Sequence, residues 1–311
     1  MRQHDLRCLL SVGFLRANQW YVRLPQVVGL ALLLAVIGFL TSDRSLANAD
    51  GLRGDWQSAY MSRSRLLAGT VKHPSGENAH YAGVQLELAP KWKTYWRSPG
   101  EAGGVPPTFD WTGSKNVKQV SVEYPAPVRM DSGYGANIGY HGHVTFPVRF
   151  EVVDPEKASE LNVDFQYGTC EDICVPSSVK LSLQIPPGNL APAPTVLSNA
   201  VKHVPNLAPL LQVNDPRLLT WKVELNGKKP HIKLDIDYGS DAVSADVFVE
   251  GPGGLFIPMS QRVAKTNLAA GTKRFWIDLS KDVDLAEIKG KPLRVTIVGD
   301  AGRSEYEILA K

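Results

Sequence analysis

Cysteine is scarce in this sequence, which has three in 311 residues. Cys8 lies near the amino terminus, whereas Cys170 and Cys174 are separated by only three residues. Soft-metal sites usually need more ligands than two thiols supply, so a metal centre built on this pair alone is disfavoured. Any chemistry of the cysteines must therefore come from a single close pair.

The sequence also lacks a long hydrophobic run. The apolar stretch Val27–Leu40 has 14 residues, fewer than the roughly 20 that a membrane-spanning helix needs. A small-x-small site, Ala47-Asn48-Ala49, follows it. A basic segment precedes it, with Arg2, Arg7, Arg16 and Arg23. We interpret residues 1–49 as an export signal cleaved after Ala49, which removes Cys8 from the mature chain.

The sequence also lacks a large excess of charge of either sign. The formal net charge is +3, but residues 1–49 hold five of the 34 Lys and Arg and two of the 31 Asp and Glu. The remaining 262 residues carry 29 of each, so the charge balance gives no reason to expect a nucleic-acid partner. A chain of this size predicts one large or two medium domains.

No convincing long amphipathic helix is present before residue 185, and short alternating runs take its place. Gly/Pro-rich connections such as 98–100 and 103–107 separate them. The segment 50–65 is mixed and polar. This pattern predicts an antiparallel β-sandwich over residues 50–187. The predicted strands are Tyr81–Leu88, Lys93–Arg97, Val117–Tyr124, His143–Val152, Leu161–Tyr167 and Ser178–Ile185.

The composition changes after Ile185. Proline-rich stretches predict a linker over 188–214, with a short helix through Val196 to His203. A second β-rich unit follows over 215–311, so the predicted fold is all-β, with two sandwiches in tandem. Its predicted strands are Leu219–Leu225, His231–Tyr238, Ala245–Glu250, Lys273–Leu279 and Leu293–Val298.

The two nearby cysteines lie where a hairpin is predicted. If 171–173 forms the loop, Cys170 and Cys174 face each other across it. Opposed residues of an antiparallel pair have Cα atoms about 4.5 or 5.5 Å apart, within the roughly 4.4–6.8 Å that suits a disulfide. The pair can therefore close and open with little movement of the backbone.

Three interpretations of the pair remain open. A structural disulfide closing so short a loop would contribute only about 2 kcal/mol. A metal site is the weakest of the three. Redox exchange is the third, because a partner thiol can reach an exposed hairpin tip. Glu171 and Asp172 between the sulfurs disfavour a thiolate, which indicates a pair that is handed electrons and passes them on.

Other motifs carry weaker signals. His141 and His143 form an H-x-H that would point to one face of a strand and could hold copper, although solvent-facing histidines are commoner. The glycines at 133, 135 and 139 do not fit a dinucleotide-binding fingerprint, and no zinc-binding or P-loop pattern is present.

Several stretches together resemble the periplasmic amino-terminal region of the DsbD thiol:disulfide interchange proteins, and most closely the branch that includes ScsB. The resemblance covers the first predicted domain well and the second more loosely. It rests on Lys91–Gly100 (KWKTYWRSPG), Pro107–Trp111 (PTFDW), Gly139–Val148 (GYHGHVTFPV) and above all Tyr167–Pro176 (YGTCEDICVP).

The resemblance implies an immunoglobulin-like sandwich in the periplasm, acting as a thiol-disulfide oxidoreductase. Its redox-active disulfide, Cys170 and Cys174, would need no other cofactor. The implied partners are a membrane-embedded thiol reductase and periplasmic thioredoxin-like or disulfide isomerase proteins. The resemblance further implies a link to cytochrome c biogenesis and copper tolerance, which are roles of this family.

The family further covers its cysteines with a cap loop, which would correspond to Asp131–Tyr140. By this resemblance Tyr134 or Tyr140 would cover the sulfurs and Asp131 could relay a proton. Tyr95 and Trp96 would line the same face, or one of them would be a core residue. The cysteines are closer together here than in DsbD, and the membrane and thioredoxin-like domains would come from separate proteins. The alternative function is a non-catalytic periplasmic scaffold, linked to copper, with a structural disulfide.

Overall fold

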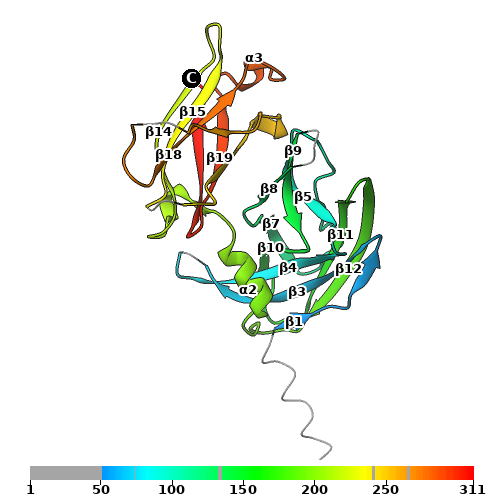
Figure 1. Cartoon of the computed structure of the whole chain (residues 1–311). Helices are drawn as coiled ribbons and strands as arrows, with labels where there is room; N and C mark the ends of the chain where they lie inside the picture. Colours follow the sequence, from blue (N-terminus) through cyan, green and yellow to red (C-terminus); the bar gives the residue numbers. More distant parts are fainter. Residues whose placement is uncertain (1–50, 74, 132–134, 240–241, 265–266) are drawn as a thin grey trace, which may run out of the picture. The chain divides into compact units, whose positions relative to one another are not determined.

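The computed structural model describes residues 51–311 except 74, 132–134, 240–241 and 265–266. The predicted export signal at 1–49 and Tyr134 lie outside the described residues. Almost every regular element is a β-strand (Figure 1). The predicted all-β fold is confirmed.

Two six-stranded sheets form the first sandwich. One has the order β1-β3-β4-β10-β7 with β2 paired to β3, and the other has the order β12-β11-β5-β9-β8 with β6 paired to β11. The strands are β1 (Leu52–Arg53), β2 (Gln57–Ala59), β3 (Ser62–Lys72), β4 (Asn78–Leu88), β5 (Lys93–Gly100), β6 (Thr108–Asp110), β7 (Val117–Val122), β8 (Val128–Asp131), β9 (Ala136–His141), β10 (His143–Val152), β11 (Ser159–Cys170) and β12 (Cys174–Ile185).

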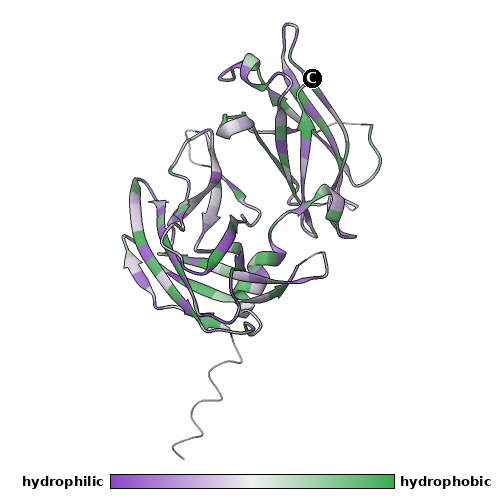
Figure 2. Cartoon of the chain, turned by 180° about the vertical axis from the view of Figure 1, so that it is seen from behind, coloured by the Kyte–Doolittle hydropathy of each residue, from purple (hydrophilic) through white to green (hydrophobic). Residues whose placement is uncertain are grey.

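Alternating hydropathy explains the hairpin of β11 and β12. The even-numbered residues of β12 from Ser178 to Gln184 are exposed, whereas Val179, Leu181 and Leu183 are buried in the main core. The same alternation appears as bands of two colours along many strands in Figure 2. The two strands pair without a register shift from Ser159 opposite Ile185 to Cys170 opposite Cys174.

Strand β3 was not predicted, because its buried residues do not alternate. Leu66 and Ala68 join the main core on one face, whereas Leu67 faces a second cluster that includes Leu197 and Val201 of helix α2 (Thr195–Lys202). A strand buried on both faces reads as a continuous apolar run, which periodicity alone cannot assign. The helix itself lies where the sequence predicted one.

The predicted cap loop needs a correction. Asp131 is the last residue of β8, and the stretch from Ala136 onward forms β9, which pairs with β8 on one side and β5 on the other. Ala136 to Tyr140 are all buried. The second half of the segment that the resemblance suggested as a loop, residues 136–140, is therefore part of an inner strand of a sheet.

Two four-stranded sheets form the second sandwich around a core of its own. Their orders are β13-β20-β19-β16 and β14-β15-β18-β17. The strands are β13 (Asn206–Leu207), β14 (Arg217–Glu224), β15 (His231–Asp237), β16 (Asp246–Glu250), β17 (Gln261–Arg262), β18 (Thr272–Asp278), β19 (Pro292–Val298) and β20 (Arg303–Leu309), with short helices η2 (Ala208–Leu210), η3 (Pro252–Gly254) and α3 (Leu285–Ile288).

Part of the predicted linker belongs to this second sandwich. Strand β13, from the 188–214 stretch, pairs in parallel with β20, a strand that was not predicted.

Within the described ranges, no helix is both long and apolar enough to cross a membrane.

Candidate functional site

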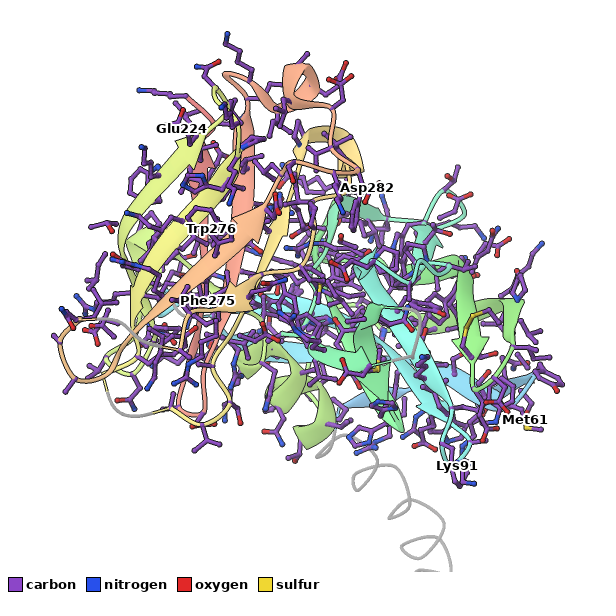
Figure 3. All side chains as sticks on the ribbon, turned by 45° about the horizontal axis from the view of Figure 1, so that its top comes forward. Met61, Lys91, Glu224, Phe275, Trp276 and Asp282 are labelled. Atoms are coloured by element: carbon purple, nitrogen blue, oxygen red, sulfur yellow. A yellow bond between two sulfur atoms is a disulfide. The ribbon has the colours of Figure 1, made fainter. Side chains whose placement is uncertain are left out.

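The two cysteines close the tip of the β11–β12 hairpin. Cys170 and Cys174 are paired in register and joined by a disulfide, and their Cα atoms are 4.2 Å apart. The intervening residues, Glu171 to Ile173, are exposed. The disulfide appears as a yellow bond on the ribbon in Figure 3. The predicted hairpin, with a three-residue loop and facing cysteines, is confirmed.

The two cysteines differ sharply in exposure. Cys170 is 1% exposed, whereas Cys174 is an exposed residue. Their positions in the sheet explain the difference. Cys170 lies between β12 and β5, where it also pairs with Lys93, while Cys174 begins β12, which is the last strand of its sheet. An attacking thiolate from outside therefore meets Cys174 first.

Tyr95 of β5 contacts both sulfurs. Its hydroxyl lies 2.8 Å from Sγ of Cys170 and 2.8 Å from Sγ of Cys174. The residue is only 2% exposed, and burial raises the pKa of its hydroxyl above the ordinary tyrosine value. The hydroxyl is therefore protonated at neutral pH and can donate a hydrogen bond.

A glycine-containing segment, Gly103–Val105, packs beside Tyr95. A Cβ added to Gly104 would overlap the Tyr95 ring, so only glycine allows this close approach. The segment is held at both ends. Asn137 Nδ2 donates to the Gly103 carbonyl at 2.7 Å, and the Gly168 amide donates to the Val105 carbonyl at 3.1 Å.

Lys93 extends the hydrogen-bond network that Asn137 forms with Gly103, since the Nζ of Lys93 donates to Asn137 Oδ1 at 2.8 Å. Sequence reasoning missed both the segment and the network. The segment contains no side chain with recognisable chemistry and looked like an ordinary connection. The close glycine pair at 103 and 104 was the only available signal.

Tyr140 and Trp96 belong to the core, which corrects the expected covering role of Tyr140. The Tyr140 hydroxyl donates to the Pro125 carbonyl at 2.7 Å, and its ring packs against Phe146. Trp96 is fully buried. Residues of a strand alternate between faces, so Trp96 points away from the face that carries Tyr95. Tyr95 therefore lines the site and Trp96 is a core residue, as the second of the two expectations had it.

Asp131 is exposed at the end of β8. It lines a shallow surface hollow together with Glu101 and Arg129. Among the described residues, the hydrogen bond to each sulfur comes from Tyr95 and not from Asp131, so a proton-relay role for Asp131 remains a prediction.

The two histidines do not share one strand. His141 ends β9 and His143 begins β10, and Gly142 between them has a φ of 69°. The strands belong to different sheets, which corrects the expectation that both side chains point to one face. In the part of the chain that the structure describes, no group of three or more His, Cys, Asp or Glu side chains could hold a metal ion.

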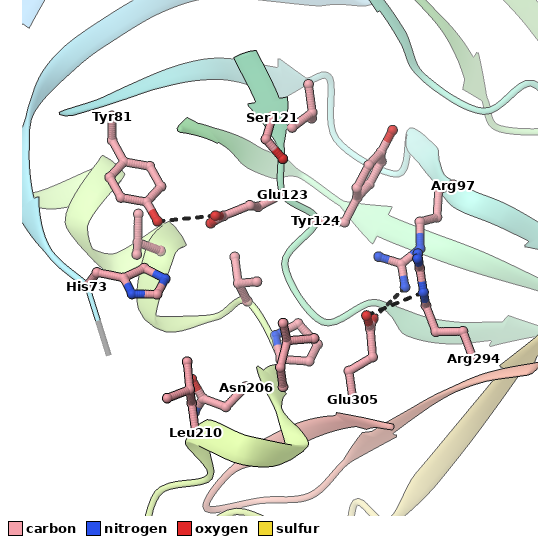
Figure 4. A pocket seen from close by; sticks show the side chains of 15 residues that line it. His73, Tyr81, Arg97, Ser121, Glu123, Tyr124, Asn206, Leu210, Arg294 and Glu305 are labelled. Atoms are coloured by element: carbon pink, nitrogen blue, oxygen red, sulfur yellow. Dashed lines mark hydrogen bonds and ion pairs between the residues drawn. The ribbon is translucent and has the colours of Figure 1, made fainter. Parts of the chain in front are cut away.

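A separate cavity of about 340 Å³ lies away from the cysteines, lined by residues that include Tyr81, Glu123 and Arg97 (Figure 4). The Tyr81 hydroxyl donates to Glu123 Oε1 at 3.2 Å. Burial raises the pKa of Glu123, while the hydrogen bond from Tyr81 and the charge of Arg149 partly oppose this. The Arg97 guanidinium donates to Glu305 at 2.6 Å and to Glu250 at 2.7 Å.

Replacing Glu123 by glutamine should stabilise the protein at pH 7.5 but have little effect at pH 4. A carboxyl with a raised folded-state pKa contributes stability below its unfolded pKa, and this is lost as the pH rises through the folded pKa. Glutamine keeps an acceptor for Tyr81 without the charge. We expect Tm to rise by about 2 °C at pH 7.5.

Thermal unfolding followed by circular dichroism at the two pH values measures this effect. Glu156→Gln, at an exposed turn position, is the control and should leave Tm unchanged at both. An equal gain at pH 4 and pH 7.5 for Glu123→Gln would show that the charge of Glu123 is not responsible.

The fold and the site together define a class of protein. It is an immunoglobulin-like β-sandwich with a cross-strand disulfide at a hairpin tip, one cysteine exposed and the other buried. Residues 66–186 match the family model described as "Thiol:disulfide interchange protein DsbD, N-terminal". The first sandwich is a DsbD-type amino-terminal domain, as the resemblance predicted.

A solved structure shares this architecture. It is the N-terminal periplasmic domain of ScsB from Proteus mirabilis, with a TM-score of 0.59 and 22% sequence identity. The match covers 83% of this chain and 98% of that chain. It therefore extends beyond the first sandwich and supports the fold of both. The search of curated proteins finds no match.

Proposed function

We propose that this protein is a periplasmic thiol:disulfide interchange module that carries electrons on Cys170 and Cys174. The observation that carries the proposal is the asymmetric disulfide at the hairpin tip. Cys174 is open to a visiting thiolate, while Cys170 is enclosed between two strands. The match of residues 66–186 to the DsbD amino-terminal family supports it.

The exchange proceeds in two displacements. A thiolate of the donor attacks Sγ of Cys174, and the bond between the two cysteines breaks with its electron pair going to Cys170. The donor's second thiolate then attacks its own sulfur in the mixed disulfide and releases Cys174. The donor is oxidised to a disulfide, and this protein holds two reduced cysteines.

The reduced pair then passes two electrons to an oxidised client by the reverse sequence. The donor of this scheme is a membrane-embedded thiol reductase, and the clients are periplasmic thioredoxin-like or disulfide isomerase proteins. No further cofactor is needed, because the cysteine pair itself carries the electrons in its reduced form.

Single-cysteine variants test this proposal. Cys170→Ser leaves the exposed Cys174 and should form mixed disulfides with a purified thioredoxin-like protein whose active-site cysteine has been activated with nitrothiobenzoate. Cys174→Ser leaves the enclosed Cys170 and should form at least ten-fold less, because a buried thiol reacts only after local opening. Non-reducing electrophoresis and mass spectrometry quantify the adducts.

The reduction potential separates exchange from a structural role. Structural disulfides generally have potentials below about −300 mV, whereas a working pair is more easily reduced. Equilibration with dithiothreitol buffers measures the value. A potential below this limit, together with inert single-cysteine variants, would leave Cys170–Cys174 as a structural disulfide and the protein as a non-catalytic scaffold.

A further inference from the structure

The contact of Tyr95 with both sulfurs has a chemical meaning beyond shielding. Its hydroxyl lies within hydrogen-bonding distance, 2.8 Å, of the Sγ atom of each cysteine in the disulfide. A disulfide sulfur is a weak acceptor, but a thiolate formed when the bond breaks is a strong one. A donor at this position gains interaction energy as the reaction proceeds.

The surrounding strands hold this hydroxyl in place. Tyr95 lies on β5, opposite Gly139 of β9, and the adjacent Thr94 Oγ1 donates to the Gly168 carbonyl at 2.8 Å. The ring packs against Gly104 and close to Gly168, where an added Cβ would come within 3.3 Å of it. The hydroxyl is thus pre-positioned and needs no rearrangement during the exchange.

We propose that Tyr95 is a catalytic residue of the exchange, whose hydroxyl donates a hydrogen bond to whichever sulfur leaves as a thiolate. This deepens the proposed function and rests on it. When a thiolate attacks Cys174, the electron pair of the broken bond goes to Cys170, and Tyr95 donates to that sulfur. When the mixed disulfide resolves, the electron pair goes to Cys174, and the same hydroxyl donates there.

The charges around the pair explain why such a donor is useful. Glu171 and Asp172 are exposed in the hairpin loop and disfavour a thiolate. Lys93, the cation paired in register with Cys170, directs its ammonium to Asn137. Tyr95 supplies a neutral donor that stays protonated over the working pH range, because burial raises the pKa of its hydroxyl.

Tyr95→Phe tests the proposal, since it keeps the ring and removes only the hydroxyl. In the full chain, reduction of the Cys170–Cys174 disulfide by dithiothreitol should be about ten-fold slower, which corresponds to the loss of one hydrogen bond to a charged sulfur. The rate is measured by stopped-flow tryptophan fluorescence, with alkylation and mass spectrometry assigning the reduced pair. The pH midpoint for iodoacetamide alkylation of Cys170 in the reduced protein should move upward.

Tyr167→Phe is the matched control. Tyr167 is fully buried on β11, three residues before Cys170, and its hydroxyl is 2.8 Å from Ser62 Oγ rather than from sulfur. Tyr167→Phe loses a buried hydroxyl in the same way, so we expect its Tm to fall about as much as that of Tyr95→Phe, while its reduction rate and alkylation midpoint stay at wild-type values.

A wild-type rate and midpoint in Tyr95→Phe would overturn the proposal, and a faster rate would assign Tyr95 to shielding instead. The test is independent of the physiological partner. If the single-cysteine variants capture no thioredoxin-like protein while Tyr95→Phe still slows reduction by dithiothreitol, the proposed function fails and the role of Tyr95 in thiol exchange stands.

Discussion

In the reduced protein, iodoacetamide should alkylate Cys174 on the order of 100-fold faster than Cys170, since a buried thiol reacts only in locally opened molecules. Cys174 lies at the start of the last strand of its sheet, whereas Cys170 is 1% exposed and has a strand on each side. Time-resolved labelling followed by mass spectrometry of the proteolytic peptides distinguishes the two cysteines. The experiment addresses the asymmetry on which the proposed order of attack depends.

The same labelling in urea is the control. Once the chain is unfolded, the two thiols differ only in their immediate sequence neighbours, and their rates should agree within a few-fold. Similar rates in the folded, reduced protein would contradict the asymmetry. Either cysteine could then accept the incoming thiolate.

Replacing Gly139 by alanine should cost about 3 kcal/mol of folding free energy, at the upper end of the range for overpacked sites. Gly139 lies on β9 between Tyr95 of β5 and Val128 of β8. A Cβ there would overlap the carbonyl oxygen of Thr94, which is backbone and cannot rotate away. The two strands must separate, and this separation moves the strand that carries Tyr95.

Gly113→Ala is the matched control, because an added Cβ there meets only Asn162 Cβ at 3.4 Å, an ordinary contact. We expect its free energy of unfolding in urea to stay within about 0.5 kcal/mol of wild type. A similarly small effect for Gly139→Ala would mean that β5 and β9 are not packed as closely as the structure indicates.

The hairpin and its disulfide were predictable because their signals are local. Period-two alternation on both sides of a three-residue loop specifies the register, and the register places Cys170 opposite Cys174. The strand His143–Val152 was predicted with its observed bounds for the same reason. Strands β3 and β9 were not predicted. Both are buried on their two faces and both contain glycine, so apolar and polar residues do not alternate along them.

The site beyond the cysteines was only partly predictable. Tyr95 was singled out through the family resemblance, but its hydroxyl contact with two sulfurs 75 and 79 residues away depends on the order of strands in the sheet. Tyr140 was expected at the sulfurs because the resemblance placed it in the cap loop, yet pairing of β9 with β5 turns its side chain into the core.

The sequence by itself determined that this protein has a cysteine pair able to close across a hairpin, since loop length and alternation are properties of neighbouring residues. Only the tertiary structure decided which sulfur faces solvent and which donor reaches it. Those features depend on β5 lying beside β11, and strand neighbours that are distant in the chain are chosen by packing of the whole core.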